Sequence, residues 1–148
     1  MSEYLFIKLL GFDEYLFIPK LVSFLGWFNI VLVCGAVLLF LLRRLNKYAF
    51  SNSSKALKKV VNPLSKIHPF IGGTLLISAF VHGDLTFVSH VFRVHTGPLI
   101  WWILLVMMLV ATIGKRFHVK NWIKVHRGLA LLMVASVLLH LFVRNLFG

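Results

Sequence analysis

Long apolar stretches bounded by basic or turn-forming residues dominate the pattern of this chain. Four of them cover residues 22–42, 64–88, 98–117 and 122–142. Each approaches the roughly 20 residues that an α-helix needs to cross the hydrocarbon core of a bilayer. The pattern predicts an all-α membrane protein, a single domain over residues 1–148 built as a bundle of four transmembrane helices. The little chain left over excludes a soluble catalytic domain.

The segments outside these spans are short, with two exceptions. Residues 1–20 are aromatic and apolar but are interrupted by a glycine, two acids and Pro19, and they lack the basic start of a secretory signal. We expect a short helix lying in the outer membrane interface there. Residues 43–63 are expected to form the one long loop. Pro63, Pro69 and Pro98 are expected near helix starts, where proline is tolerated.

Composition agrees with a membrane protein. Hydrophobic residues make up 59% of the chain and charged residues 14%, against roughly 45–50% and 25% in soluble domains. The same composition excludes intrinsic disorder. The single Cys34 excludes a disulfide framework and a multi-cysteine metal site. The net charge of +12 does not indicate nucleic-acid binding, because the basic residues gather at the ends of apolar runs.

The distribution of basic residues predicts the orientation. Twelve of the 16 Lys and Arg residues flank the first-to-second and third-to-fourth connections, and all four acids lie on the other side. By the positive-inside rule the basic side is cytoplasmic and both termini lie outside, in a plasma membrane of bacterial type. We also expect the basic loops to attract anionic membrane lipids. The twelve are Arg43, Arg44, Lys47, Lys55, Lys58, Lys59, Lys66, Lys115, Arg116, Lys120, Lys124 and Arg127.

Four of the seven histidines form a pattern. His68 and His82 are 14 residues apart in the second span, and His126 and His140 are 14 apart in the fourth. Fourteen helical steps fall about 40° short of four full turns, so each pair shares one face, with about 21 Å between its members. The two spans run in the same direction, because one span separates them. His68 and His126 should therefore share an inner depth, and His82 and His140 an outer depth.

Two cross-helix histidine pairs at two depths are what two six-coordinate haems b require, because each iron takes an imidazole from either side. Polar residues inside a span are costly and tend to mark function. We therefore predict that His68 and His126 ligate an inner haem iron and that His82 and His140 ligate an outer one. A bare metal ion fits less well, because no carboxylate or thiol accompanies either pair.

Serines accompany the outer histidines. Ser78 and Ser136 each lie four residues before His82 and His140. A ligating imidazole usually donates its second N–H to a carbonyl or a polar side chain, and a residue one turn earlier is suitably placed. The alternative is that each serine bonds only to its own helix.

Small and apolar residues fit the same interior face. Gly72 and Ala130 lie four residues after the inner histidines, and Ala79 lies three before His82. Small side chains there leave room for a flat macrocycle, although they also serve plain helix packing. Leu75 and Met133, seven after the inner histidines, are expected to fill the space between the two depths as core residues.

Several other residues are weaker candidates. His90, His95 and His118 are expected in loop or interface positions. His95 with Arg93 could approach an outer propionate or the electron acceptor. Cations near the inner pair could neutralise inner propionates; these are Lys66, Lys124 and Arg127.

The second and fourth spans resemble the ferric-reductase-like transmembrane cytochrome b domain, the haem core also found in NADPH oxidases. The matching residues are His68-Pro-Phe-Ile-Gly-Gly with His82, and Trp122-Ile-Lys-Val-His126-Arg127 with His140. The likeness covers about residues 60–145. Quinol-oxidising cytochromes b also pair histidines on parallel helices, but their glycine-rich and aromatic surroundings are not evident here.

The resemblance implies electron transfer across the membrane through two b-type haems. This chain has four spans where many members have six, and it lacks their fused flavin and nicotinamide domain. Electrons would therefore come from a separate cytoplasmic flavoprotein or from quinol, and would pass to an external acceptor. Reduction of ferric iron or oxygen at the outer haem would make the protein an enzyme, whereas a pure carrier would not be one.

Two alternatives remain open at this point. The first is a haem-bearing membrane anchor subunit of a quinone-linked oxidoreductase complex. The second is a haem-free scaffold or transporter, which the sparse polar residues inside the spans disfavour. Donor, acceptor and oligomeric state are not readable from the sequence.

Overall fold

The structure, a computed structural model, describes residues 14–89 and 96–142. These residues form α2 (Glu14–Tyr48), α3 (Lys55–Ser89), α4 (Gly97–Arg116) and α5 (Trp122–Phe142), with no strand among them. All four helices are long and apolar enough to cross a membrane. For the described residues, the predicted all-α membrane fold with four helices able to span a bilayer is confirmed.

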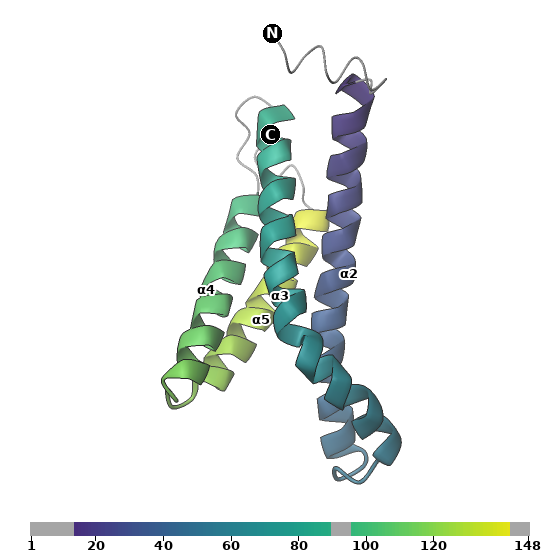
Figure 1. The fold of residues 1–148 in the computed structure, drawn as a ribbon, viewed down its shortest axis with the longest axis vertical. Helices are drawn as coiled ribbons and strands as arrows, with labels where there is room; N and C mark the ends of the chain where they lie inside the picture. The colour runs from purple at the N-terminus through teal and green to yellow at the C-terminus, as the bar shows by residue number, and fades with distance from the viewer. Residues whose placement is uncertain (1–13, 90–95, 143–148) are drawn as a thin grey trace.

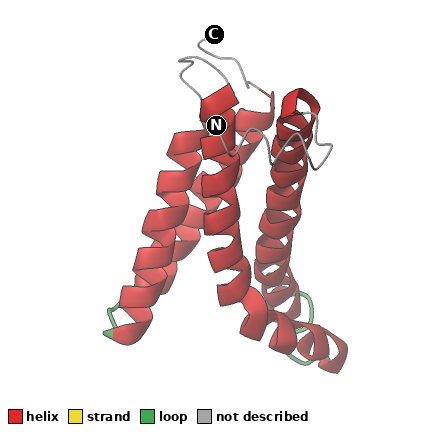
Figure 2. Cartoon of the chain, turned by 45° about the horizontal axis from the view of Figure 1, so that its top comes forward, coloured by secondary structure: helices red, strands yellow, loops and turns green. Residues whose placement is uncertain are grey.

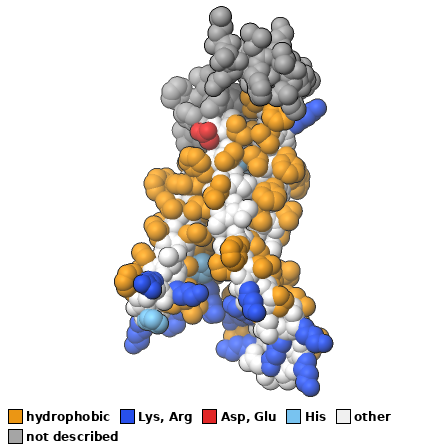
Figure 3. Space-filling model, in the orientation of Figure 1, with side chains coloured by type: hydrophobic (Ala, Val, Ile, Leu, Met, Phe, Trp, Pro, Cys, Tyr) orange, Lys and Arg blue, Asp and Glu red, His pale blue; other side chains and the backbone are white. Residues whose placement is uncertain are grey.

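The helices form two antiparallel hairpins, α2–α3 and α4–α5 (Figure 1). The two hairpins are joined mainly through α3 and α4, and α3 and α5 run in the same direction, as the sequence predicted. Figure 2 shows the hairpins diverging towards the ends that carry their turns. We call this the basic end, because Lys and Arg gather there on both hairpins (Figure 3).

The first two helices are longer than the apolar runs that predicted them. Each has 35 residues, or about 52 Å of helix, whereas a bilayer core is about 30 Å thick. Residues 14–20 continue into α2 without a break at Pro19, so that part of the expected interfacial segment is corrected; residues 1–13 lie outside the described residues. Pro19 is the sixth residue of α2 and removes one backbone hydrogen bond, which weakens the helix there without ending it. The expected loop 43–63 shrinks to residues 49–54.

Two of the three prolines expected at helix starts lie inside a helix. Pro98 is in the first turn of α4, as predicted, but Pro63 and Pro69 are both within α3. Each removes a backbone N–H and crowds the carbonyl four residues earlier, which bends a helix rather than ending it. Figure 1 shows the first half of α3 leaning away from the direction of its second half.

A close glycine contact shapes the α4–α5 turn. Gly114 is buried, and a β-carbon there would overlap Cβ and Cγ of Trp122. The missing side chain lets the first residue of α5 pack directly on α4. His118 and Asn121 in this turn have φ of 52° and 67°. Trp122 then contacts the His126 ring, with centroids 6.3 Å apart, so the turn sets where α5 begins relative to His126.

The core lies between the two predicted histidine depths. Leu75 and Met133 are 3% and 2% exposed and pack with Ile103 and Leu104 of α4. Their predicted core position is confirmed. Most other large apolar side chains are exposed and form the middle band in Figure 3, as expected where lipid rather than protein covers the helices.

Candidate functional site

The inner histidine pair comes together from two helices. His68 of α3 and His126 of α5 have ring centroids 6.3 Å apart, with ring planes 79° apart. Both side chains are partly buried. The predicted match in depth is therefore confirmed for this pair, although its members are 58 residues apart in the chain.

The His126 ring is held by the neighbouring helix. Its Nδ1 lies 3.2 Å from the carbonyl oxygen of Met107 in α4. A carbonyl oxygen only accepts, so Nδ1 carries the proton and donates. The lone pair of the neutral ring is then on Nε2, which is the form that ligates a metal.

The partner ring of His68 is less satisfied. Its Nδ1 is buried and has no hydrogen-bond partner among the described residues. A buried polar atom without a partner costs free energy, and such atoms in native proteins call for an explanation such as a ligand or water. In the inner pair, the His126 ring is oriented by a hydrogen bond to α4. The His68 ring has a buried Nδ1 without a hydrogen-bond partner among the described residues.

A cation from α2 reaches the same level, and the sequence did not single it out. Arg43 donates from Nη2 to Ser65 Oγ at 2.7 Å, and Ser65 lies one turn before His68 on α3. Nothing in the pattern distinguished Arg43 from the other cations of the basic end. Only the pairing of α2 with α3 places it beside the inner pair.

The outer histidine of α3 is held by α2. His82 Nδ1 lies 3.0 Å from the carbonyl oxygen of Val22, so by the same reasoning Nδ1 donates and Nε2 carries the lone pair. A β-carbon at Gly26, one turn further along α2, would lie 3.3 Å from His82 Cε1. The glycine thus allows a closer approach of α2 to the imidazole than most side chains would permit.

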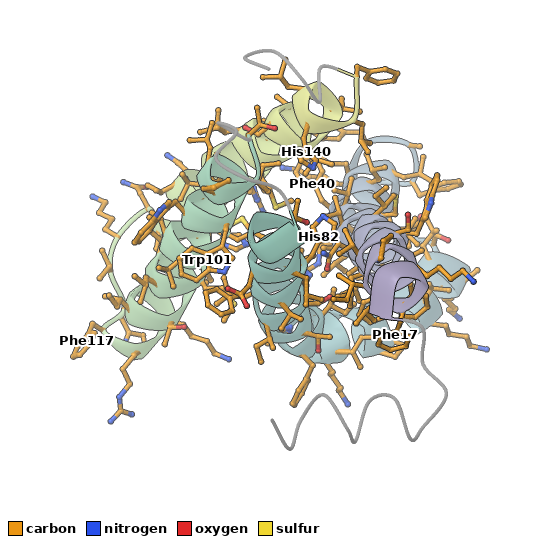
Figure 4. The ribbon with its side chains drawn as sticks, turned by 90° about the horizontal axis from the view of Figure 1, so that it is seen from above. Phe17, Phe40, His82, Trp101, Phe117 and His140 are labelled. Atoms are coloured by element: carbon orange, nitrogen blue, oxygen red, sulfur yellow. The ribbon has the colours of Figure 1, made fainter. Side chains whose placement is uncertain are left out.

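The outer histidine of α5 is held at the start of α4. His140 Nδ1 lies 2.6 Å from Thr96 Oγ1. Thr96 is the N-cap residue of α4, yet its side chain makes no capping hydrogen bond, so its hydroxyl serves His140 instead. Seen from above in Figure 4, His82 lies between α3 and α2, and His140 lies on the inner side of α5.

These contacts correct the predicted role of the two serines. Ser78 and Ser136 are both buried, at 8% exposure, but the Nδ1 atoms assigned to them bond to Val22 and Thr96. Ser78 Oγ has no hydrogen-bond partner in the described part of the chain. A backbone carbonyl such as that of Val22 leaves no signature in a sequence. Pro98 indicated a helix start in the sequence, but the contact of Thr96 with His140 was not readable there.

The three small residues Gly72, Ala79 and Ala130 have different surroundings. A β-carbon at Gly72 would lie 3.5 Å from Met108 Sδ, an ordinary contact distance, and the place of Gly72 beside a macrocycle stays a prediction. Ala79 packs on the central core. Ala130 is partly buried in α5, and its place beside a cofactor stays a prediction.

The remaining candidates lie at the margins. Lys66, Lys124 and Arg127 are exposed, and the last two line a shallow hollow with Trp122 near the α4–α5 turn. Their pairing with propionates stays a prediction. His118 is exposed in that turn. The candidates His90, Arg93 and His95 lie outside the described residues.

No family model matches the chain, and no curated protein or solved structure matches it either. The chemistry of the site is therefore argued from the histidines and the groups that hold them.

Proposed function

We propose that this protein is a di-haem membrane cytochrome that carries electrons across the bilayer. His68 and His126 would hold an inner haem b, and His82 and His140 an outer one. The observation that carries the proposal is the contact of the inner pair, contributed by two parallel helices at one depth.

The spacing of the inner rings fits an iron between them. Two opposed imidazole ligands place their centroids about 6 Å apart, because each metal–nitrogen bond is about 2 Å long and each centroid lies about 1 Å beyond its nitrogen. The observed separation is 6.3 Å. Packed aromatic rings also lie at such separations, so the fit supports the proposal together with the hydrogen bonds of the rings.

The ring nitrogen that carries the hydrogen in each imidazole supports the same function. A ligating imidazole usually donates its second N–H to a carbonyl or polar group, which fixes the tautomer and raises the basicity of the ligating nitrogen. His82 and His126 donate from Nδ1 to carbonyl oxygens, and His140 Nδ1 lies beside a hydroxyl. Three of the four predicted ligands therefore have the partner that a ligand needs.

The number of protein ligands also favours haem over a bare ion. A structural zinc ion takes four ligands from the protein, but no group of three or more His, Cys, Asp or Glu side chains comes together within residues 14–89 and 96–142. A porphyrin brings four nitrogens of its own, so two histidines complete the coordination of its iron. A pair is thus sufficient for haem.

Residues of this chain would hold the two haems and fill the space between them. When bound, haem b supplies a one-electron ferric/ferrous couple at each depth. The histidine pairs would hold the two haems, and fourteen helical steps separate the two depths by about 21 Å. Leu75, Leu104 and Met133 fill the space between the depths and exclude water from it.

The charge distribution gives the proposed direction. With the basic end in the cytoplasm, a flavoprotein or quinol would donate on the side of His68 and His126. The membrane potential favours outward movement of an electron by about 2.3 kcal/mol per 100 mV. The external acceptor decides whether the protein is a reductase or a carrier.

A haem count tests the cofactor directly. Protein purified after expression with ample haem supply should contain about two haems b per chain, the number that two bis-histidine sites require. The measurement is a reduced-minus-oxidised spectrum with pyridine haemochromogen quantification. A colourless, folded protein would refute the proposal.

Ligand variants test the pairing. His126→Ala should remove the inner haem and halve the haem content, and His68→Ala should give the same spectrum. His118→Asn is the matched control, because asparagine tolerates the positive φ of 52° found there, and it should keep both haems. Two normal haems in either alanine variant would contradict the assigned ligands.

A further inference from the structure

The α2–α3 hairpin extends beyond the membrane core at its basic end. We call residues 43–60 the hairpin tip: the last turns of α2, the connecting turn and the start of α3. α4 and α5, with 20 and 21 residues, are about 30 Å long and match the core thickness. The tip therefore stands further out than the α4–α5 turn, and Figure 1 shows it leaning away from the bundle.

The tip interleaves cations with exposed apolar side chains. It contains no acid, and all six of its Lys and Arg residues are exposed. Tyr48 is 65% exposed, and Leu45, Phe50 and Val60 are each about half exposed. The six cations are Arg43, Arg44, Lys47, Lys55, Lys58 and Lys59.

The tip is an ordered surface rather than a loose linker. The Arg44 guanidinium lies 5.3 Å from the ring centroids of both Phe40 and Tyr48 and donates to the Tyr48 hydroxyl at 2.6 Å. Lys47 Nζ lies 5.4 Å from the Tyr48 ring. A surface that is already formed loses less entropy when it binds a ligand.

The turn of the tip is closed by its own backbone. Asn52 N–H donates to the Asn46 carbonyl at 2.8 Å. The Ser54 hydroxyl accepts from the Leu57 N–H at 3.3 Å and caps the start of α3. The two helix ends of the tip therefore keep a defined relation to each other.

We infer that the hairpin tip binds the phosphate groups of anionic phospholipids at the membrane surface. Cations near an anionic membrane surface attract its phosphates, and aromatic side chains settle at the level of the headgroups. The bend of α3 turns the tip to one side of the bundle, as is needed for a segment that lies along a membrane surface. An acidic soluble protein would pair with the cations but would leave the apolar side chains in water. This inference does not depend on haem.

The test uses the full chain in nanodiscs that contain phosphatidylcholine and phosphatidylglycerol. Native mass spectrometry measures which lipid stays bound when the protein is released. In the tip variant Arg44, Lys47, Lys58 and Lys59 are all changed to Gln. One interfacial cation contributes about a fivefold preference for anionic lipid, so the loss of four should lower the preference for phosphatidylglycerol by about 600-fold.

Two matched controls separate the tip from charge in general. Exchanging Lys and Arg at the same four positions keeps the charge and should keep the preference within about threefold. Changing Lys115, Arg116, Lys120 and Lys124 to Gln removes the same net charge from the α4–α5 hairpin and should lower the preference much less. Equal losses in the two Gln variants would overturn the inference, because net charge alone would then explain the binding.

A spin label at Ser51→Cys, on a Cys34→Ser background, gives a second readout. In phosphatidylglycerol discs the label should be shielded from a water-soluble relaxation agent, and in phosphatidylcholine discs it should be accessible. If the label stays accessible in both, and soluble polyglutamate binds as tightly as phosphatidylglycerol, the tip is a docking surface for an acidic protein and the inference fails.

Discussion

Three of the four histidines predicted as ligands take their orientation from atoms on other helices. His82 donates to a carbonyl of α2, His126 donates to a carbonyl of α4, and His140 lies against the hydroxyl at the start of α4. A ligand aimed from a neighbouring helix keeps its geometry only while that helix stays close. Residues that allow the close approach are therefore as important as the hydrogen-bond partners.

Gly26 allows α2 to approach His82 closely, and Gly26→Ala should disturb the outer site. The new methyl would press on His82 Cε1 from 3.3 Å and weaken the bond to Val22. A less basic imidazole favours ferrous iron, so the outer haem's midpoint potential should rise by roughly 20–60 mV, the equivalent of one hydrogen bond. Potentiometric titration measures the shift.

Gly73→Ala is the control, because a β-carbon at Gly73 meets nothing within 4 Å. Both variants should retain two haems. An unchanged potential in Gly26→Ala would show that α2 does not position His82.

At the scale of elements, the start of α4 does two tasks. Thr96 begins the helix but uses its hydroxyl on His140. Thr96→Val should therefore leave α4 intact while weakening haem retention at the outer site by about 10–100-fold, as loss of a ligand's partner commonly does. The rate of haem transfer to excess apomyoglobin measures this.

Thr96→Ser restores a hydroxyl at the same position and should recover slow haem loss. If valine and serine behave alike, the contact with His140 has no part in holding the cofactor.

The α4–α5 hairpin depends on the absence of a side chain at Gly114. Gly114→Ala should force Trp122 away from α4 and cost about 1–3 kcal/mol, the usual penalty of overpacking. For a chain of this size that lowers the melting temperature by about 2–12 °C. Gly128→Ala is the control, since a β-carbon there meets open space, and it should melt near the unsubstituted protein in detergent.

At the scale of the whole molecule, charge separates the two ends of the bundle. Twelve exposed cations occupy the basic end, and by the positive-inside rule we propose that this end faces the cytoplasm. In a Cys34→Ser background, a membrane-impermeant maleimide should label Gly97→Cys on intact cells. It should label Ser51→Cys and Lys120→Cys only after permeabilisation. The reverse pattern would invert the proposed direction of electron flow.

Helix number, the shared direction of α3 and α5 and the core position of Leu75 and Met133 were all readable from local patterns. Apolar runs of bilayer length predict spanning helices, and helical periodicity places residues seven and fourteen apart near one face. The helix ends were less readable: α2 continues through Pro19 and α3 through Pro63 and Pro69. A single proline bends or weakens a helix without always ending it, so composition alone misplaced these boundaries.

The sequence by itself determined that the chain is a four-helix membrane protein with His68 and His126 at one depth, because spacing along a helix is a local property. Only the tertiary structure decided what holds the rings. The groups that hold the rings lie on neighbouring helices. They are the carbonyl oxygens of Val22 and Met107, the hydroxyl of Thr96 and the missing side chain at Gly26. Such contacts depend on which helices pack together, and neither a carbonyl nor a missing β-carbon marks its partner in the pattern of residues.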